Sequence, residues 1–230
     1  RLGAPLLLVF LVLGMLAGED GLIGIHFSDY RSTFAVGSVA LAIILFEGGL
    51  RTPRSVVRLV LWPAVSLATL GVLLSALAIA GFAHLLLGLS PLEGVLLGAV
   101  LASTDAAAVF MLLHGRGSSV NARIAGTLEL ESGMNDPMAV FLTLVCVQLL
   151  QRPDLSPGLY ALEELAVELI GGAVLGLAGG FALRLAVERL NLTTALYPIL
   201  IAAGAILIFG GANLIGASGF LAVYLSGMVL

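Results

Sequence analysis

Apolar runs long enough to cross a bilayer follow one another along almost the whole sequence. Each is about 20 residues long, the length that a transmembrane helix needs. Of all residues, 60% are hydrophobic and 10% are charged, whereas about 25% are charged in an ordinary soluble domain. The chain is therefore predicted to be an all-α polytopic membrane protein. The predicted spans are residues 3–18, 32–50, 59–82, 92–113, 124–150, 165–187, 195–212 and 216 onward, the last one incomplete.

Basic residues indicate which side of the membrane each loop faces. All ten are arginine, and if the amino end is cytoplasmic, eight of them fall on the cytoplasmic side. Cytoplasmic loops carry an excess of Lys and Arg, so we expect a multi-pass protein of the plasma (inner) membrane with a cytoplasmic amino end. The eight are Arg1, Arg51, Arg54, Arg58, Arg116, Arg123, Arg184 and Arg189, and the other two are Arg31 and Arg152.

Composition also argues against several classes of function. The single cysteine, Cys146, cannot form an internal disulfide. No basic patch or interleaved aromatic stripe is present, so nucleic acid is not expected as a partner. The glycine-rich run 171–180 lacks the Gly-x-x-x-x-Gly-Lys pattern of a phosphate loop and is expected to serve helix packing. The three histidines lack metal-ligand spacing, and no cofactor is expected.

A weak internal repeat relates the first predicted span to the last. Residues 2–16 align without gaps to residues 215–229, with Gly, Ala, Leu, Gly and Met identical at five positions. The two spans would cross the membrane in opposite directions, as an inverted repeat of a secondary transporter requires. We therefore expect residues 1–230 to form the amino-terminal part of a longer transmembrane domain. Its parts would be a first repeat at about 1–150, a linking span at about 160–190 and the start of a second repeat at about 195–230.

The fourth predicted span carries polar residues near its middle. Ser103 and Thr104 are suited to cap a helix, and the alanine-rich run after Asp105 favours a new helix. A broken span is therefore predicted, with free carbonyls facing a cavity and Asp105 neutralising the positive ends of half-helices. The alternative is an unbroken helix in which Asp105 pairs with a buried arginine.

The fifth predicted span carries two polar stripes. At 100° per residue, Glu129, Ser132 and Asp136 share one face, while Glu131 and Asn135 share the adjoining face. An ionisable residue near the bilayer midplane is costly, and it is by default a candidate functional site.

Pro137 adds a bare carbonyl to the first stripe. It has no amide hydrogen to give to Gly133, so that carbonyl is released one turn before the proline. Carboxylate, hydroxyl and carbonyl oxygens together suit an alkali cation, and we interpret Asp136 as its ligand. A structural ion-pair network between helices is the alternative, and it is the interpretation that we favour for Glu131.

Glu47 lies about one turn inside the cytoplasmic end of the second predicted span. Gly48 and Gly49 follow it and would let another backbone approach closely. Two interpretations stay open from composition: a second carboxylate ligand of the cation, or an end residue that extends to the membrane surface near Arg51.

Three motifs resemble those of the sodium/proton exchanger family of monovalent cation:proton antiporters, and in particular its bacterial potassium/proton members. They are Leu-Phe-Glu-Gly-Gly-Leu at 45–50, Ser-Thr-Asp-Ala-Ala-Ala-Val-Phe at 103–110 and Glu-Ser-Gly-Met-Asn-Asp-Pro-Met-Ala at 131–139. The resemblance runs essentially from end to end. It implies an inverted-repeat fold with discontinuous helices, a homodimer, and a thirteen-span scheme in which these spans are the second to the ninth.

The resemblance also implies roles for individual residues. Asp136 would be the shared cation and proton site, and Asn135-Asp136 would be the Asn-Asp signature of electroneutral exchange. Glu131 would pair with an arginine of a later span, outside this sequence. Further cation ligands would be Glu47, Ser132 and the carbonyl of Thr104.

Competition at one carboxylate gives a mechanism: a proton and a K⁺ or Na⁺ displace each other at Asp136, one for one. We expect K⁺ to be favoured, and we expect a transporter rather than an enzyme. Two rivals belong to other classes. A gated cation channel would need a continuous polar pore, whereas the charges here gather on one helix pair. An intramembrane aspartyl protease would show Gly-x-Gly-Asp, but Asp136 follows Gly-Met-Asn.

Overall fold

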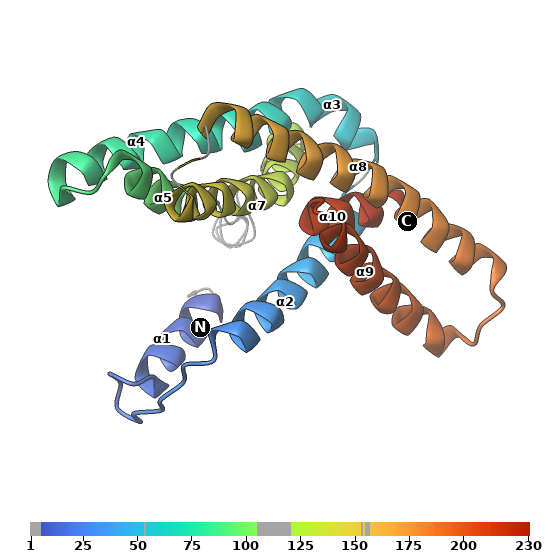
Figure 1. Cartoon of the computed structure of the whole chain (residues 1–230). Coiled ribbons are helices and arrows are strands. Elements are labelled where there is room, and N and C mark those ends of the chain that lie inside the picture. The colour runs from blue at the N-terminus through green and yellow to red at the C-terminus, as the bar shows by residue number, and fades with distance from the viewer. Residues whose placement is uncertain (1–5, 53, 105–120, 153, 155–156) are drawn as a thin grey trace.

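The computed structural model of the chain describes residues 6–52, 54–104, 121–152, 154 and 157–230 (Figure 1). Throughout these residues the regular structure is helical, which confirms the predicted all-α class. The helices are α1 (Leu6–Ala17), α2 (Tyr30–Arg51), α3 (Arg54–Ser66), the π-helical turn η1 (Leu67–Gly71), α4 (Val72–Leu87), α5 (Pro91–Leu101), α7 (Ala122–Gln151), α8 (Pro157–Arg189), the 3₁₀ turn η2 (Thr194–Leu196), α9 (Tyr197–Leu214) and α10 (Gly219–Val229).

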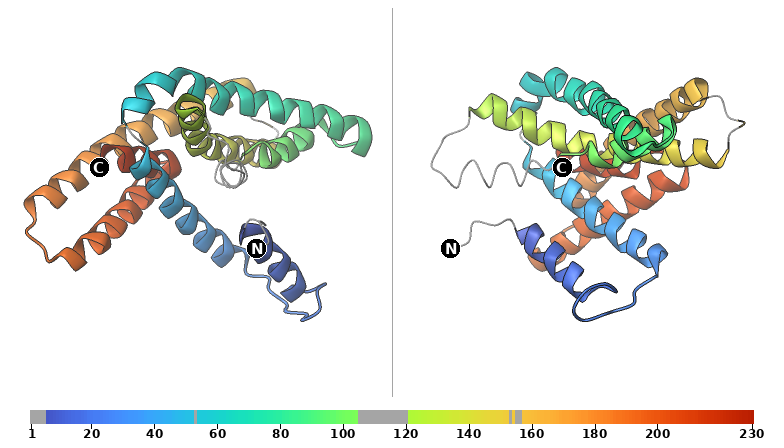
Figure 2. Two further views of the ribbon diagram at one scale, coloured as in Figure 1. Left: turned by 180° about the vertical axis from the view of Figure 1, so that it is seen from behind. Right: turned by 90° about the vertical axis from the view of Figure 1, so that its left-hand side faces the viewer.

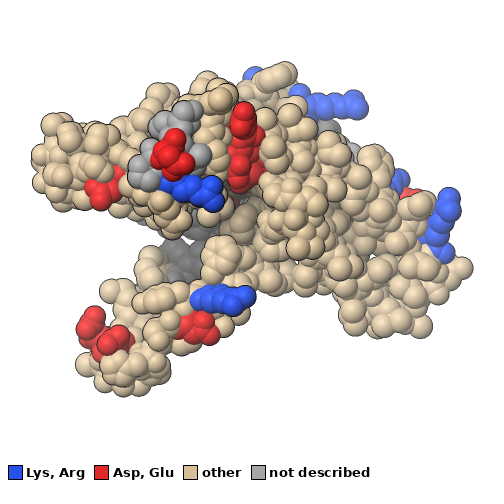
Figure 3. Space-filling view, in the orientation of Figure 1, with Lys and Arg blue, Asp and Glu red and all other residues tan. Residues whose placement is uncertain are grey.

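Five helical stretches are long and apolar enough to cross a membrane, namely Tyr30–Leu50, Val57–Leu87, Arg123–Gln151, Gly158–Arg189 and Thr194–Leu214. They coincide with five of the predicted spans. The other three predicted spans correspond to the shorter apolar helices α1, α5 and α10. Residues 105–120, which include the second half of the predicted fourth span, lie outside the described residues. Figure 3 shows how few charged side chains interrupt the face of the molecule drawn there.

Local signals in the sequence fix several helix ends. Asp29 caps α2 by accepting hydrogen bonds from the Ser32 hydroxyl at 2.6 Å and the Ser32 amide at 3.0 Å. These two bonds hold the pKa of Asp29 below its usual value. The cap is therefore complete above the ordinary pKa of an aspartate and is lost as the pH falls through the lowered value. Gly88, with φ of +68°, ends α4 in the left-handed region.

Most of the helices form two packing groups. The α10 group consists of α2, α8, α9 and α10, and the α7 group consists of α3, η1, α4, α5 and α7. Figures 1 and 2 show α10 in the middle of its group, where α2, α8 and α9 meet. Most residues of α10 are buried.

Glycine allows α2 and α10 to cross with their backbones in contact. A Cβ atom on Gly49 would lie 2.2 Å from the carbonyl oxygen of Tyr224, and one on Gly227 would lie 2.3 Å from the carbonyl oxygen of Phe46. Real Cβ atoms do not approach backbone oxygens so closely, so any other residue would force the two helices apart.

One tyrosine lies where the two groups meet. Tyr224 of α10 is 1% exposed, and its ring lies beside both α2 and α7. A Cβ atom on Gly133 of α7 would lie 2.5 Å from ring atoms Cε2 and Cζ of Tyr224, and one on Gly48 of α2 would lie 3.9 Å from Cε2. The face of α7 at Gly133 is therefore fitted to this ring.

Candidate cation site

The candidate site forms where the end of α5 meets the middle of α7. Helix α5 ends at Leu101, Ala102 is its C-cap, and Ser103 and Thr104 are not helical. The break therefore begins at the predicted position, and an unbroken helix is wrong as far as residue 104. Asp105 and the predicted second half-helix lie outside the described residues.

Two hydrogen bonds join Ser103 and Thr104, which follow the end of α5, to the Ser132 and Asp136 face of α7. The Ser103 hydroxyl donates to Oδ1 of Asp136. The Ser132 hydroxyl donates to the carbonyl oxygen of Thr104 at 3.0 Å. The carboxylate, the two hydroxyls and the carbonyl thus lie in two neighbouring hydrogen bonds between residues that are 28 and 33 positions apart in sequence.

A second network lies on the adjoining face of α7, as the helical spacing predicted. The Thr104 hydroxyl donates to Oε1 of Glu131 at 3.1 Å, and Nδ2 of Asn135 lies 2.9 Å from the same Oε1 and 2.5 Å from the Thr104 hydroxyl oxygen. Glu131 is 9% exposed and Asn135 is fully buried. Within the part of the chain that the structure describes, Oδ1 of Asn135 has no hydrogen-bond partner.

Replacing Thr104 with valine is expected to destabilise the protein by about 1–3 kcal/mol, because buried Glu131 and Asn135 would each lose a partner. Thr104→Ser keeps the hydroxyl and should melt close to the wild type. The measurement is thermal unfolding of the full-length protein in detergent. Equal melting temperatures for the Val and Ser variants would contradict this role of the hydroxyl.

Pro137 lies inside α7, which continues through it to Gln151. The proline leaves the Gly133 carbonyl without its helical donor, as the sequence predicted. Gly133 is also the residue that contacts the Tyr224 ring. One turn of α7 thus carries a released carbonyl, a contact with the α10 group through Tyr224, and Asp136.

The predicted site residues are only partly brought together. Thr104, Glu131, Ser132, Asn135 and Asp136 lie within the two networks described above. Glu47 lies on α2 with an exposed side chain, and its part in the site stays a prediction, as does that of Asp105.

Three contributions were missed by sequence reasoning. Ser103 was assigned only to capping, Thr104 was assigned to capping and to cation binding through its carbonyl, and Tyr224 was not considered. The Ser-Thr pair beside Asp105 was a signal that both hydroxyls could face α7. The position of Tyr224 depends on packing between distant helices, for which the sequence offers no local signal.

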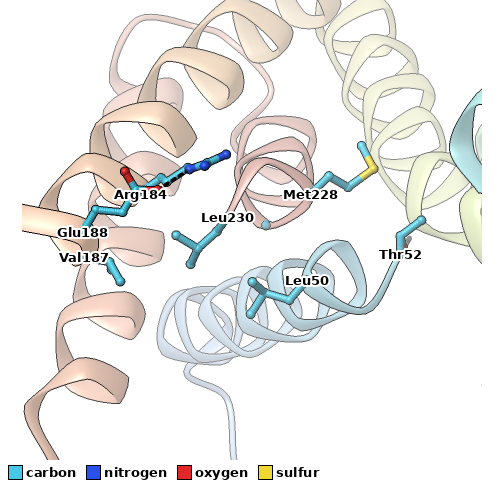
Figure 4. A pocket seen from close by; sticks show the side chains of 8 residues that line it. Leu50, Thr52, Arg184, Val187, Glu188, Met228 and Leu230 are labelled. Carbon is cyan, nitrogen blue, oxygen red and sulfur yellow. Dashed lines mark hydrogen bonds and ion pairs between the residues drawn. The ribbon is translucent and has the colours of Figure 1, made fainter. Parts of the chain in front are cut away.

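A cavity of about 490 Å³ opens elsewhere, between the ends of α2, α8 and α10 (Figure 4). Arg184 and Glu188 of α8 line it, and Nε of Arg184 donates to Oε1 of Glu188 at 2.7 Å. Leu50 of α2 and Met228 of α10 add apolar walls. Because its acid and base pair with each other and it shares no residue with the site at Asp136, we assign it no part in cation binding.

Comparison with known proteins assigns this chain to a family. The sequence model described as "Sodium/hydrogen exchanger, transmembrane" matches residues 1–230. The chain belongs to the sodium/hydrogen exchanger family. This result confirms the resemblance that the three sequence motifs indicated. The family is one of antiporters.

Curated members of the exchanger family match the entire chain. The "K(+)/H(+) antiporter NhaP2" of Shewanella sp. (strain ANA-3) is 46% identical over 231 positions, covering 100% of this chain and 40% of that protein. The "K(+)/H(+) antiporter NhaP" of Alkalimonas amylolytica is 46% identical over 227 positions, covering 99% of this chain and 39% of that protein. The chain thus spans about 40% of the length of these relatives.

A solved structure of the family shares the fold. The sodium proton antiporter MjNhaP1 from Methanocaldococcus jannaschii, at pH 8, matches with a TM-score of 0.74 and 28% sequence identity. The match covers 96% of this chain and 54% of that one. The helix arrangement described above is therefore the arrangement of an exchanger.

Proposed function

We propose that the full-length protein containing this chain exchanges a monovalent cation for H⁺ across the inner membrane, with K⁺ favoured over Na⁺. One observation carries the proposal: Asp136 lies in the middle of a membrane-length helix and accepts a hydrogen bond from Ser103 at the end of α5, where Ser132 also donates to the Thr104 carbonyl. An ionisable side chain in such a place is expensive, and it is retained where it serves transport. The preference for K⁺ is supported by the names of the relatives that are 46% identical.

The exchange follows from competition at one carboxylate. An ionised Asp136 can hold a dehydrated alkali cation together with other oxygens, and the proposed ligands are the Thr104 carbonyl and the Ser132 hydroxyl, which are hydrogen-bonded to each other. A protonated Asp136 carries no charge and releases the cation. Glu47 completes the proposed ligand set from α2.

The neighbouring polar residues are assigned supporting parts. Glu131 accepts hydrogen bonds from Thr104 and Asn135 on the face adjoining Asp136, and its burial supports a structural part. Asn135 has an uncharged amide at its position, where a carboxylate would add a second negative charge to the site. One titrating site then exchanges one proton for one cation, so the exchange is electroneutral.

Access would alternate by movement of the α7 group against the α10 group. The two groups meet chiefly along α7, where Tyr224 contacts Gly133. We further propose that the α10 group belongs to a fixed dimerisation unit of a homodimer, and that the amino end is cytoplasmic. The uneven distribution of the arginines supports that orientation.

The test uses the purified full-length protein in vesicles that contain a pH-sensitive dye. After a proton gradient is imposed, adding K⁺ should discharge it, and an imposed membrane potential should leave the rate unchanged. A gradient that K⁺, Na⁺ and Li⁺ all leave intact would refute exchange. A rate that rises clearly with potential would refute one-for-one stoichiometry and point to a second proton carrier.

A further inference from the structure

The hydroxyl of Ser103 has no assigned part in the exchange, yet it donates directly to Oδ1 of Asp136. Two other hydroxyls where the end of α5 meets α7 donate to other acceptors: Ser132 donates to the Thr104 carbonyl, and the Thr104 hydroxyl donates to Glu131. Ser103 thus places an oxygen atom beside the carboxylate at which the cation would bind.

The position of Ser103 is held firmly while its side chain stays accessible. Ala99 and Ala102, which precede it, are 0% and 6% exposed. A Cβ atom on Gly98 would lie 2.2 Å from the carbonyl oxygen of Ala76, so α5 is fixed closely against α4. The side chain of Ser103 is itself exposed. An ion arriving at Asp136 would meet this hydroxyl at a defined place.

We propose that Ser103 supplies an oxygen ligand to the transported cation and thereby favours K⁺ over the smaller Na⁺ and Li⁺. The inference rests on the proposed function and adds a residue to its site. A hydroxyl is both donor and acceptor, and its hydrogen rotates to suit its partner. Without a cation it donates to Asp136, and with a cation its lone pair turns toward the ion.

The preference for K⁺ follows from the number of oxygens. Selectivity between alkali cations depends on how many oxygens surround the ion and how strongly each one attracts it. A larger ion is surrounded by more oxygens, so more oxygens of the site take the place of water in its hydration shell. Removing one oxygen should therefore weaken K⁺ binding more than Li⁺ binding.

The test compares Ser103→Ala, Ser103→Cys and Ser103→Thr in the full-length protein in vesicles. The half-saturating concentration and maximal rate of exchange are measured for K⁺, Na⁺ and Li⁺. Ser103→Ala should raise the half-saturating K⁺ concentration roughly five- to tenfold, as expected for one lost polar contact. The Li⁺ value should change less than about twofold, since the smaller ion needs fewer oxygens.

Two variants separate ligation from folding. Ser103→Cys keeps the size of the side chain but presents sulfur, a soft ligand that suits alkali cations poorly, and should behave like Ser103→Ala. Ser103→Thr keeps the oxygen and should stay near the wild type. Ser66→Ala is the matched control, because Ser66 lies on α3 of the same group and donates to the Trp62 carbonyl.

The outcomes are distinguishable. An unchanged K⁺ value in both Ser103→Ala and Ser103→Cys, or an equal rise for K⁺ and Li⁺, would overturn the assignment of Ser103 while leaving exchange intact. A wild-type protein that exchanges none of the three cations for H⁺ would instead overturn the proposed function itself.

Discussion

Asp136→Asn should abolish cation-driven proton flux while leaving the fold intact. Asparagine has nearly the shape of aspartate, and its side-chain oxygen can still accept the Ser103 hydrogen. It cannot take up or release a proton, and it offers no charge to a cation. We expect the rate to fall by at least about two orders of magnitude, because the proposed exchange assigns both the cation and the proton to the Asp136 carboxylate.

The measurement is dye-reported exchange in vesicles, with thermal unfolding recorded on the same preparation. Asp29→Asn is the matched control, because Asp29 caps α2 outside the span and asparagine caps helices about as well as aspartate. Asp29→Asn should therefore transport like the wild type. A well-folded Asp136→Asn protein that still exchanges K⁺ for H⁺ would show that the shared site lies elsewhere.

Gly49→Ala should cause a large loss of stability by adding a single methyl group. Its Cβ atom would lie 2.2 Å from the carbonyl oxygen of Tyr224 and 3.1 Å from the amide nitrogen of Met228. Both are backbone atoms of buried α10 and cannot turn aside as a side chain could. We expect a cost of about 3 kcal/mol or more, at the upper end of overpacking effects.

Gly37→Ala provides the matched control on the same helix. A Cβ atom there meets nothing within 4 Å, so alanine should be neutral or should stabilise α2 by about 0.5–1 kcal/mol. Melting temperatures in detergent decide the comparison, and a drop of about 5 °C or more is expected for Gly49→Ala alone. Equal melting temperatures would mean that α2 and α10 do not cross as closely as described.

The sequence predicted the membrane-length helices well, because apolar runs of fixed length are a direct physical requirement of the bilayer. It placed their ends less well. Helix α8 begins at Pro157, eight residues before the predicted span at 165. Its first turns carry Glu163 and Glu164. These charges limit the apolar run, but they do not prevent the helix from starting before them. The π-helical turn in the third predicted span was also missed, since its residues are as apolar as their neighbours.

The candidate site could be predicted where it depends on one helix and not where it depends on two. Helical spacing alone put Ser132 with Asp136 and Glu131 with Asn135, and both pairings agree with the networks in the structure. The partners of these faces come from the end of α5, and their choice depends on how α5 packs on α7. The close contact of Gly98 with Ala76 fixes α5 against α4, and no local pattern in the sequence predicts it.

Cation affinity as a function of pH tests the central claim most directly. Binding of K⁺ to the purified full-length protein is measured by calorimetry, without a membrane or a gradient. If a proton and a cation share Asp136, the apparent Kd should rise about tenfold for each unit of pH below the pKa of the site, and Asp136→Asn should bind no K⁺. A Kd that stays constant across that range, in a protein that does bind K⁺, would contradict exchange by competition at one carboxylate.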